Sequence, residues 1–157
     1  MGTPIDLRVA RHGAILLFLG MLTGFVIVDF HNRGVGNAAH LTGLIGGYGL
    51  IALGLLWPKL NLGRWSGAGA WVTAASLYLN WLGLVLQGGF GSGPKAPSSP
   101  RLGSTALWDH IGGFILTLAV LLSLLSGLIV LIGLRKVAAP ADPLSPSQRD
   151  DRVVSRR

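Results

Sequence analysis

Four apolar stretches, each long enough to cross a bilayer, constrain this chain more than any other feature. They cover residues 12–30, 40–57, 67–87 and 107–134 of a 157-residue sequence. A membrane-spanning helix needs roughly 20 predominantly apolar residues. Because backbone polar groups inside lipid must be satisfied within their own segment, each stretch is expected to be a helix. The sequence therefore predicts an all-α polytopic membrane protein built as a four-helix bundle.

Composition narrows the possible functions further. Half of the residues are apolar (50%), 12% are charged, and cysteine is absent. The lack of cysteine excludes disulfides, zinc–thiolate sites, iron–sulfur clusters and thiol nucleophiles. No phosphate-binding loop, zinc-protease motif or defensible serine–histidine–aspartate arrangement is present either. The formal net charge of +7 does not indicate nucleic acid, because the basic residues flank the apolar stretches, where they orient membrane segments.

The distribution of these basic residues predicts the topology. Most Lys and Arg residues lie before the first stretch, between the second and third, and after the fourth. The positive-inside rule then predicts that both termini lie on the cytoplasmic side of the membrane, which we expect to be a bacterial-type inner membrane. We expect a cytoplasmic segment at residues 1–11 and a transmembrane domain at 12–134. The Gly/Pro/Ser-rich loop at 88–106 should be irregular, and the basic tail at 135–157 should be disordered.

One polar side chain interrupts the third apolar stretch near its middle. Asn80 lies there, with Tyr78 and Trp81 beside it. Polar groups inside a membrane are costly and often mark functional sites, so Asn80 is a candidate pocket residue. The alternative is a hydrogen bond between helices, worth roughly 1 kcal/mol. Both interpretations remain open from sequence.

The histidines are candidate metal ligands. His12 is expected at the inner end of the first helix, and His31, His40 and His110 at the outer ends of the first, second and fourth helices. Imidazole is an established ligand of haem iron. Three histidines at one membrane level would either converge on a metal or lie separately at the interface between lipid and water.

His40 differs from the other histidines because of the glycines that follow it. Gly43 and Gly47 are four residues apart, and they share a helix face with His40. Bare backbone beside a histidine would let a flat macrocycle such as haem lie against the helix. The alternative is a close helix–helix contact of the small-xxx-small kind.

Three short motifs make the chain resemble the styrene oxide isomerase family of small four-helix membrane proteins. These are ARHG at residues 10–13, AHLTGL at 39–44 and LLWP at 55–58. An Asn in an aromatic setting (Asn80) follows, and then a Gly/Pro-rich loop and a last long helix. The resemblance covers roughly residues 8–136.

The resemblance implies a homotrimer that binds haem b, with His40 as the axial iron ligand and Gly43 and Gly47 beside the cofactor. Ferric haem would act as a Lewis acid that converts a small apolar aryl epoxide, entering from lipid, to an aldehyde. Asn80 would help to hold the substrate. Tyr48 and Tyr78 are nearby hydroxyls, and they join Asn80 as candidate catalytic residues.

The sequence departs from the family pattern at three pocket positions. Gly46 stands where the family has an Asn, Leu84 where it has a Tyr, and Ser76 where it has an acidic residue. Two alternatives to an epoxide isomerase therefore stay open. One is a non-catalytic haem b protein for electron transfer, with His31 or His110 as a second axial ligand. The other is a haem-free membrane partner or small transporter.

Overall fold

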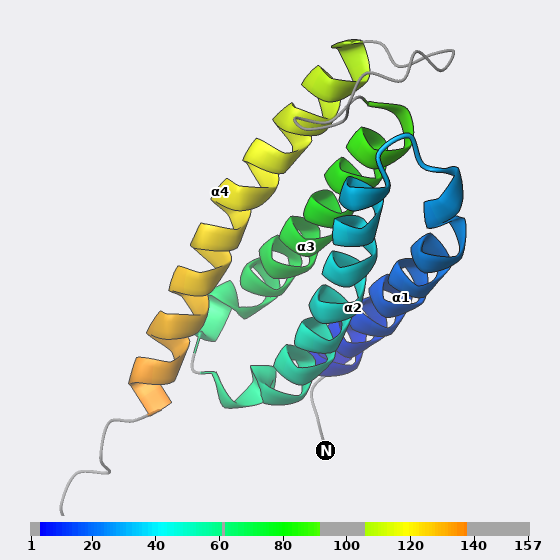
Figure 1. Cartoon of the computed structure of the whole chain (residues 1–157). Coiled ribbons are helices and arrows are strands. Elements are labelled where there is room, and N and C mark those ends of the chain that lie inside the picture. Colours follow the sequence, from blue (N-terminus) through cyan, green and yellow to red (C-terminus); the bar gives the residue numbers. More distant parts are fainter. Residues whose placement is uncertain (1–3, 61, 92–105, 138–157) are drawn as a thin grey trace, which may run out of the picture.

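The protein is a bundle of four long helices (Figure 1), seen in a computed structural model that describes residues 4–60, 62–91 and 106–137. The helices are α1 (Pro4–Val26), α2 (Arg33–Leu56), α3 (Ser66–Phe90) and α4 (Ala106–Val137). All four are long and apolar enough to cross a membrane. No strand occurs among the residues that the structure describes. The prediction of an all-α protein is confirmed for the described residues, and its four long helices are candidate membrane spans.

The helices are longer than the apolar stretches that predicted them. α1 begins at Pro4, eight residues before the first apolar stretch. α2 begins at Arg33, because only a single 3-10 turn (Ile27–Asp29) and a short link separate it from α1. The Asn32 side chain accepts a hydrogen bond from the Val35 backbone N–H at 3.2 Å and caps α2. Hydropathy locates the length that lipid can cover, and the helices continue into polar sequence beyond it. The irregular loop predicted at 88–106 and the disordered tail predicted at 135–157 lie mostly outside the described residues, which exclude 92–105 and 138–157.

α1 and α2 pack through glycines that bring their backbones together. A Cβ added at Gly43 would lie 2.5 Å from the Gly20 Cα, and one at Gly47 would lie 2.6 Å from the Leu17 backbone nitrogen. Neither space could hold a side chain. The two helices therefore meet at bare backbone, as small-residue contacts between membrane helices do.

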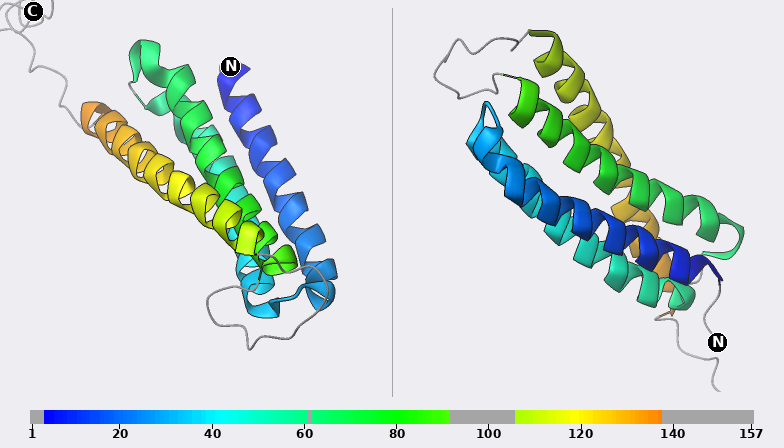
Figure 2. Two further views of the ribbon diagram at one scale, coloured as in Figure 1. Left: turned by 90° about the horizontal axis from the view of Figure 1, so that it is seen from above. Right: turned by 90° about the vertical axis from the view of Figure 1, so that its right-hand side faces the viewer.

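α3 lies between this helix pair and α4. It packs against α2 and α1 on one side and against α4 on the other (Figure 2). On the α4 side, Gly83 lies next to Leu116, and the buried Thr73 and Ser126 hydroxyl oxygens are 2.6 Å apart. The opposite side of α4 exposes many large apolar side chains, among them Phe114, Leu121, Leu124, Leu128 and Leu131. Such a surface suits lipid or another subunit.

One end of the bundle carries most of the charge that the structure describes. Arg8 and Arg11 lie near the start of α1, Lys59 and Arg64 lie in the link between α2 and α3, and Arg135 lies near the end of α4. We call this end the basic end. Arg33 lies at the opposite end, where α1 passes into α2. This distribution agrees with the positive-inside pattern. That the basic end faces the cytoplasm stays a prediction.

Core packing is centred near the basic end. The Trp57 side chain is only 1% exposed, and its indole N–H donates to Ser66 at 3.0 Å (Oγ) and 3.1 Å (backbone oxygen). Leu16, Leu50 and Ala74 are buried in the same cluster. This cluster joins α1, α2 and α3 and leaves the other end of the bundle free to form a groove, described below.

The hydroxyl pair between α3 and α4 yields a modest stability prediction. Replacing Ser126 with alanine should destabilise the bundle by about 0.5–1 kcal/mol, because the Thr73 hydroxyl loses its partner across the interface. The loss stays small since Thr73 still donates to the Gly69 carbonyl at 2.9 Å. Denaturant unfolding in detergent measures the change. Ser123→Ala, one turn earlier on α4, is the matched control and should stay near wild type. Equal losses in the two variants would contradict the assigned contact.

Candidate functional site

The His40 side chain packs against two glycines of α1, Gly20 and Gly24, and we call this position the imidazole seat. The half-buried imidazole lies two turns into α2, and its Nδ1 is 2.7 Å from the Gly20 backbone oxygen. A Cβ added at Gly24 would lie 2.8 Å from the Nδ1 and Cε1 atoms of the ring. Any residue other than glycine at position 24 would therefore meet the imidazole. The position of the imidazole therefore depends on two glycines of α1, Gly20 and Gly24.

This hydrogen bond fixes which ring nitrogen carries the lone pair. A carbonyl oxygen can only accept, so Nδ1 of neutral His40 must be the donor. Nε2 is then the nitrogen with a free lone pair. Metal-ligating histidines are commonly oriented in this way, with the second nitrogen donating to a backbone carbonyl. The ring lines an open hollow of about 300 Å³ together with Met21, Gly24 and Phe25.

The other histidines do not join His40. His31 and His110 are exposed at the end of the bundle opposite the basic end. His12 lies near the basic end, edge-on to the Trp71 ring with centroids 5.1 Å apart. Within residues 4–60, 62–91 and 106–137, no group of three or more His, Asp or Glu side chains is placed to hold a metal ion. Of the two interpretations of the outer histidines, separate interfacial positions fit the structure better than convergence.

The two glycines after His40 serve the contact between α1 and α2. Gly43 and Gly47 are buried, and the space beside each is filled by α1 backbone at Gly20 and Leu17. For these two residues the structure shows the helix–helix contact and not an open face. Gly43 nevertheless bears on the site, because Gly20 both contacts it and accepts the His40 hydrogen bond.

The three candidate catalytic residues lie apart from His40. Tyr78 donates its hydroxyl to the His12 backbone oxygen at 2.9 Å, towards the basic end. Tyr48 is 64% exposed on the surface of α2. Asn80 is half-buried, one turn before Gly83, on the side of α3 that packs against α4. Its amide makes no hydrogen bond to any residue that the structure describes. The catalytic role of all three stays a prediction.

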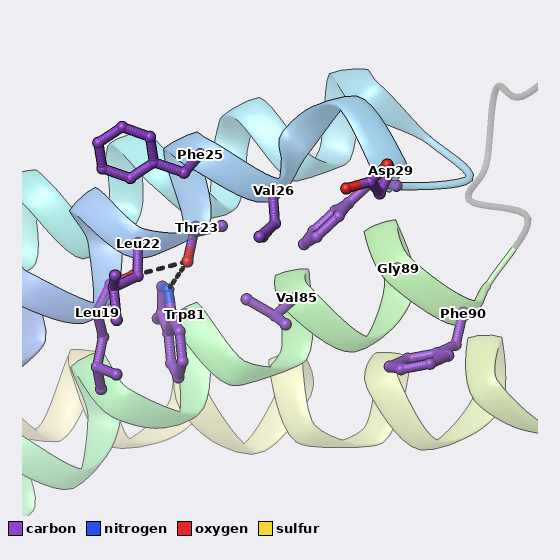
Figure 3. A pocket seen from close by; sticks show the side chains of 11 residues that line it. Leu19, Leu22, Thr23, Phe25, Val26, Asp29, Trp81, Val85, Gly89 and Phe90 are labelled. Atoms are coloured by element: carbon purple, nitrogen blue, oxygen red, sulfur yellow. Dashed lines mark hydrogen bonds between the residues drawn. The ribbon is translucent and has the colours of Figure 1, made fainter.

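A larger apolar groove opens between α1 and α3 at the end opposite the basic end (Figure 3). Its volume is about 610 Å³, within the usual range for small-molecule sites. Leu and Val side chains line it, with aromatic rings on both helices and the exposed Asp29 at its edge. Its lining residues are Leu19, Leu22, Thr23, Phe25, Val26, Asp29, Phe30, Trp81, Val85, Gly89 and Phe90.

A hydrogen-bonded pair organises the wall of this groove. The Trp81 indole N–H donates to the Thr23 hydroxyl at 3.1 Å, and that hydroxyl donates to the Leu19 carbonyl at 2.8 Å (Figure 3). With its polar atoms satisfied, the wall presents an apolar face. The sequence did not predict this pair. A Thr in one apolar helix and a Trp in another are both visible in the sequence, but nothing in the sequence shows that they are in contact.

The groove and the His40 hollow are neighbours. Phe25, which is 78% exposed, lines both of them. Trp81 also reaches the α1–α2 contact, since a Cβ at Gly43 would lie 3.1 Å from the Trp81 Cδ1. The two hollows therefore flank the same segment of α1, with the imidazole on one side and the groove on the other.

Sequence comparison finds two relatives of this chain among known proteins. The chain is 34% identical over 147 residues to hydroxylaminobenzene mutase HabB of Ectopseudomonas oleovorans, which covers 92% of this chain and 90% of that protein. It is 36% identical over 125 residues to hydroxylaminobenzene mutase HabA of the same organism, covering 78% and 93%. No solved structure matches the chain significantly.

The family comparison covers nearly all of the described bundle. The family model described as styrene oxide isomerase matches residues 5–135. Together with the mutases, which are relatives of the same family, this match points to a membrane isomerase or mutase. The resemblance stated from the sequence motifs is confirmed, and the chain belongs to the styrene oxide isomerase family.

Proposed function

We propose that the protein is a membrane-embedded isomerase that rearranges a small aromatic substrate, with haem b bound through His40. The observation that carries the proposal is the seat of this imidazole. Its Nδ1 is held by the Gly20 carbonyl, and its ring lines an open hollow over Gly24. Among the described residues, no other histidine has one ring nitrogen hydrogen-bonded to a backbone carbonyl and its ring in an open hollow.

The residues around His40 fit a haem ligand. The Nδ1 hydrogen bond orients the ring, as second-nitrogen hydrogen bonds commonly do for histidines that bind metals. Met21, Gly24 and Phe25 supply an apolar surface beside it. A haem bound there would supply a Lewis-acidic ferric iron able to draw electron density from a substrate oxygen.

A hollow of about 300 Å³ that opens on the outside of the bundle cannot bury a macrocycle alone. A second surface must cover it, and lipid or another subunit are the available ones. We propose a homotrimer, which the family resemblance implies. Close packing of apolar helix faces, such as the exposed face of α4, supports assembly in the membrane.

The proposed substrate class is based on the name of the family and on the names of the two relatives. Styrene oxide and hydroxylaminobenzene both carry a benzene ring next to the atom that bears the reactive oxygen. In both cases breaking the bond to oxygen leaves positive charge that the ring can delocalise. We propose an aryl epoxide as substrate, converted to an aldehyde. An aryl hydroxylamine is the second candidate, favoured by the identity of 34–36% to the two mutases.

The groove between α1 and α3 is proposed to receive the substrate from the bilayer. Its lining is almost entirely apolar, and its aromatic side chains Phe25, Phe30 and Trp81 offer edges and faces to a benzene ring. Phe25 then forms the boundary that the substrate passes on the way to the His40 hollow. An apolar path keeps water away, and water would otherwise trap a cationic species as a diol.

A two-substrate assay tests this function. Membranes containing the protein are supplied with styrene oxide and, separately, with hydroxylaminobenzene, and products are separated by chromatography before their masses are measured. We expect an isomer of unchanged mass from at least one substrate, without added oxidant or reductant. A diol, heavier by one water, or no turnover of either compound by haem-loaded protein would refute the proposal.

Variants in the same assay address the candidate residues. Trp81→Ala opens the groove wall and should raise KM for the substrate that is turned over. Asn80→Ala should lower kcat, because the Asn80 amide is the candidate that would hold the substrate and makes no hydrogen bond to any residue that the structure describes. Ser126→Ala, which affects a helix contact only, serves as the control for general loss of stability and should leave both parameters unchanged.

A further inference from the structure

A separate cavity lies between α1 and α3 at the basic end of the bundle. Its volume is about 180 Å³, somewhat more than the roughly 150 Å³ of an engineered cavity that holds benzene. Three side chains give it chemical character: the Arg8 guanidinium, the His12 imidazole and the Trp71 indole. The apolar remainder of its wall is formed by Val9, Ala70 and Ala74.

The polar groups of this cavity have no partners among the described residues. The His12 ring lies edge-on to two aromatic rings, Trp71 at 5.1 Å and Tyr78 at 6.0 Å between centroids. No described side chain accepts or donates a hydrogen bond at its ring nitrogens, and none pairs with the exposed Arg8. Both groups are therefore available to a ligand.

The charge of the surroundings favours an anion. Every charged side chain that the structure describes at the basic end is cationic, namely Arg8, Arg11, Lys59, Arg64 and Arg135. A guanidinium binds phosphoryl and carboxylate oxygens in bidentate fashion, and an imidazole N–H adds a further donor. Arg8 and His12 are one helical turn apart on α1, so both can reach one tetrahedral group.

The position of the cavity favours a lipid as the source of that anion. The membrane-crossing segment of α1 begins at Leu7, so Arg8 and His12 lie in its first turns, at the expected level of the headgroups. Trp71 is 60% exposed beside them, and Val9, Ala70 and Ala74 are buried behind them. A free phosphate ion has no apolar part to place against these walls, whereas a phospholipid has one.

We propose that this cavity binds the phosphoryl group of an anionic phospholipid, with Arg8 and His12 contacting the phosphate oxygens and Trp71 flanking the apolar part. Basic pockets between membrane helices are known to hold anionic headgroups. The bound lipid would tie α1 to α3, since the lining of the cavity comes from these two helices and Arg8 of α1 is its one described cation. The site is distinct from the His40 hollow, and the proposal does not depend on the proposed function.

Thermal unfolding of the delipidated full chain in detergent tests the site. At about a hundredfold excess over Kd, phosphatidylglycerol should raise the unfolding temperature by roughly 5–10 °C. Phosphatidylcholine, which has no net charge, should raise it much less. Arg8→Gln should lose most of the response, as should His12→Phe, which keeps an aromatic ring against Trp71 and Tyr78.

Arg11→Gln is the matched control, because Arg11 is an exposed arginine of the same helix that does not line the cavity. It should respond like the wild type. Native mass spectrometry should also count one fewer phosphatidylglycerol per chain on Arg8→Gln, even if that variant is less stable. Equal responses of Arg8→Gln and Arg11→Gln would overturn the proposal. A shift with inorganic phosphate alone as large as that with phosphatidylglycerol would also overturn it, by assigning the site to a free anion.

Discussion

Replacing His40 with alanine is expected to give a folded bundle that no longer retains haem b. The imidazole is the ligand that the geometry prepares, since its Nδ1 is anchored on Gly20 and Nε2 carries the lone pair. Changes to residues that merely orient a metal ligand cost about 10- to 100-fold in affinity, so removing the ligand itself should cost at least as much. The side chain is half-buried in an open hollow, so its loss should disturb packing little.

The measurement is the Soret absorbance of detergent-purified protein, with haem quantified as the pyridine haemochrome. His110→Ala provides the matched control, because His110 is an exposed histidine at the same end of the bundle. It should keep near-stoichiometric haem. Full retention of haem by His40→Ala would show that another residue is the ligand. Restoration of the Soret band in His40→Gly by added imidazole would show that the loss is one of ligation and not of folding.

The spectrum of the wild-type protein also separates two functions. An isomerase needs an open axial position for the substrate oxygen, so we expect a high-spin ferric spectrum that shifts when imidazole is added. A low-spin, six-coordinate and readily reducible spectrum would favour electron transfer instead. His31 and His110, the candidates for a second ligand in that alternative, are exposed at the end of the bundle opposite the basic end.

The sequence predicted the helices well because lipid imposes a simple rule. Each span must satisfy its backbone internally, so four apolar stretches of sufficient length predict four helices. Helix ends were predicted less well, since α1 and α2 extend into polar sequence where water can solvate the backbone. The start of α2 at Arg33 follows from the Asn32 cap and a tight link, and hydropathy does not register such features.

The candidate site was predicted only as far as local spacing allows. His40 was singled out because it precedes glycines on its own helix, and its role as a haem ligand stays a prediction. The features that orient its ring come from another helix: the Gly20 carbonyl and the missing side chain of Gly24. Gly43 and Gly47 had two interpretations, since spacing along α2 cannot say whether α1 or a cofactor fills the adjacent space. The groove formed by Thr23 and Trp81 depends on tertiary contacts alone.

These observations give α1 a double role. Its glycine face contacts α2 and seats His40, while its Thr23 side forms one wall of the groove against α3. A shift of α1 relative to α2 would therefore change packing, the imidazole seat and the groove together. The most severe single change in the bundle should be the one that forces this shift.

Gly43→Ala is expected to be that change. The new Cβ would lie 2.5 Å from the Gly20 Cα and 3.0 Å from the Gly20 nitrogen, and backbone cannot rotate away as a side chain can. The helices must separate, and overpacking of this kind typically costs about 1–3 kcal/mol or more. Because Gly20 also accepts the His40 hydrogen bond, the shift should weaken cofactor retention as well as stability.

Gly49→Ala is the matched control on the same helix. No atom lies within 4 Å of a Cβ added there, and alanine is a better helix former than glycine by roughly 0.5–1 kcal/mol. Denaturant unfolding in detergent, followed by circular dichroism, should place Gly49→Ala at or above wild type and Gly43→Ala well below it. Haem content should fall with stability only in Gly43→Ala. If both variants unfold like the wild type, then α1 and α2 do not meet at bare backbone, and the imidazole seat derived from that contact fails with it.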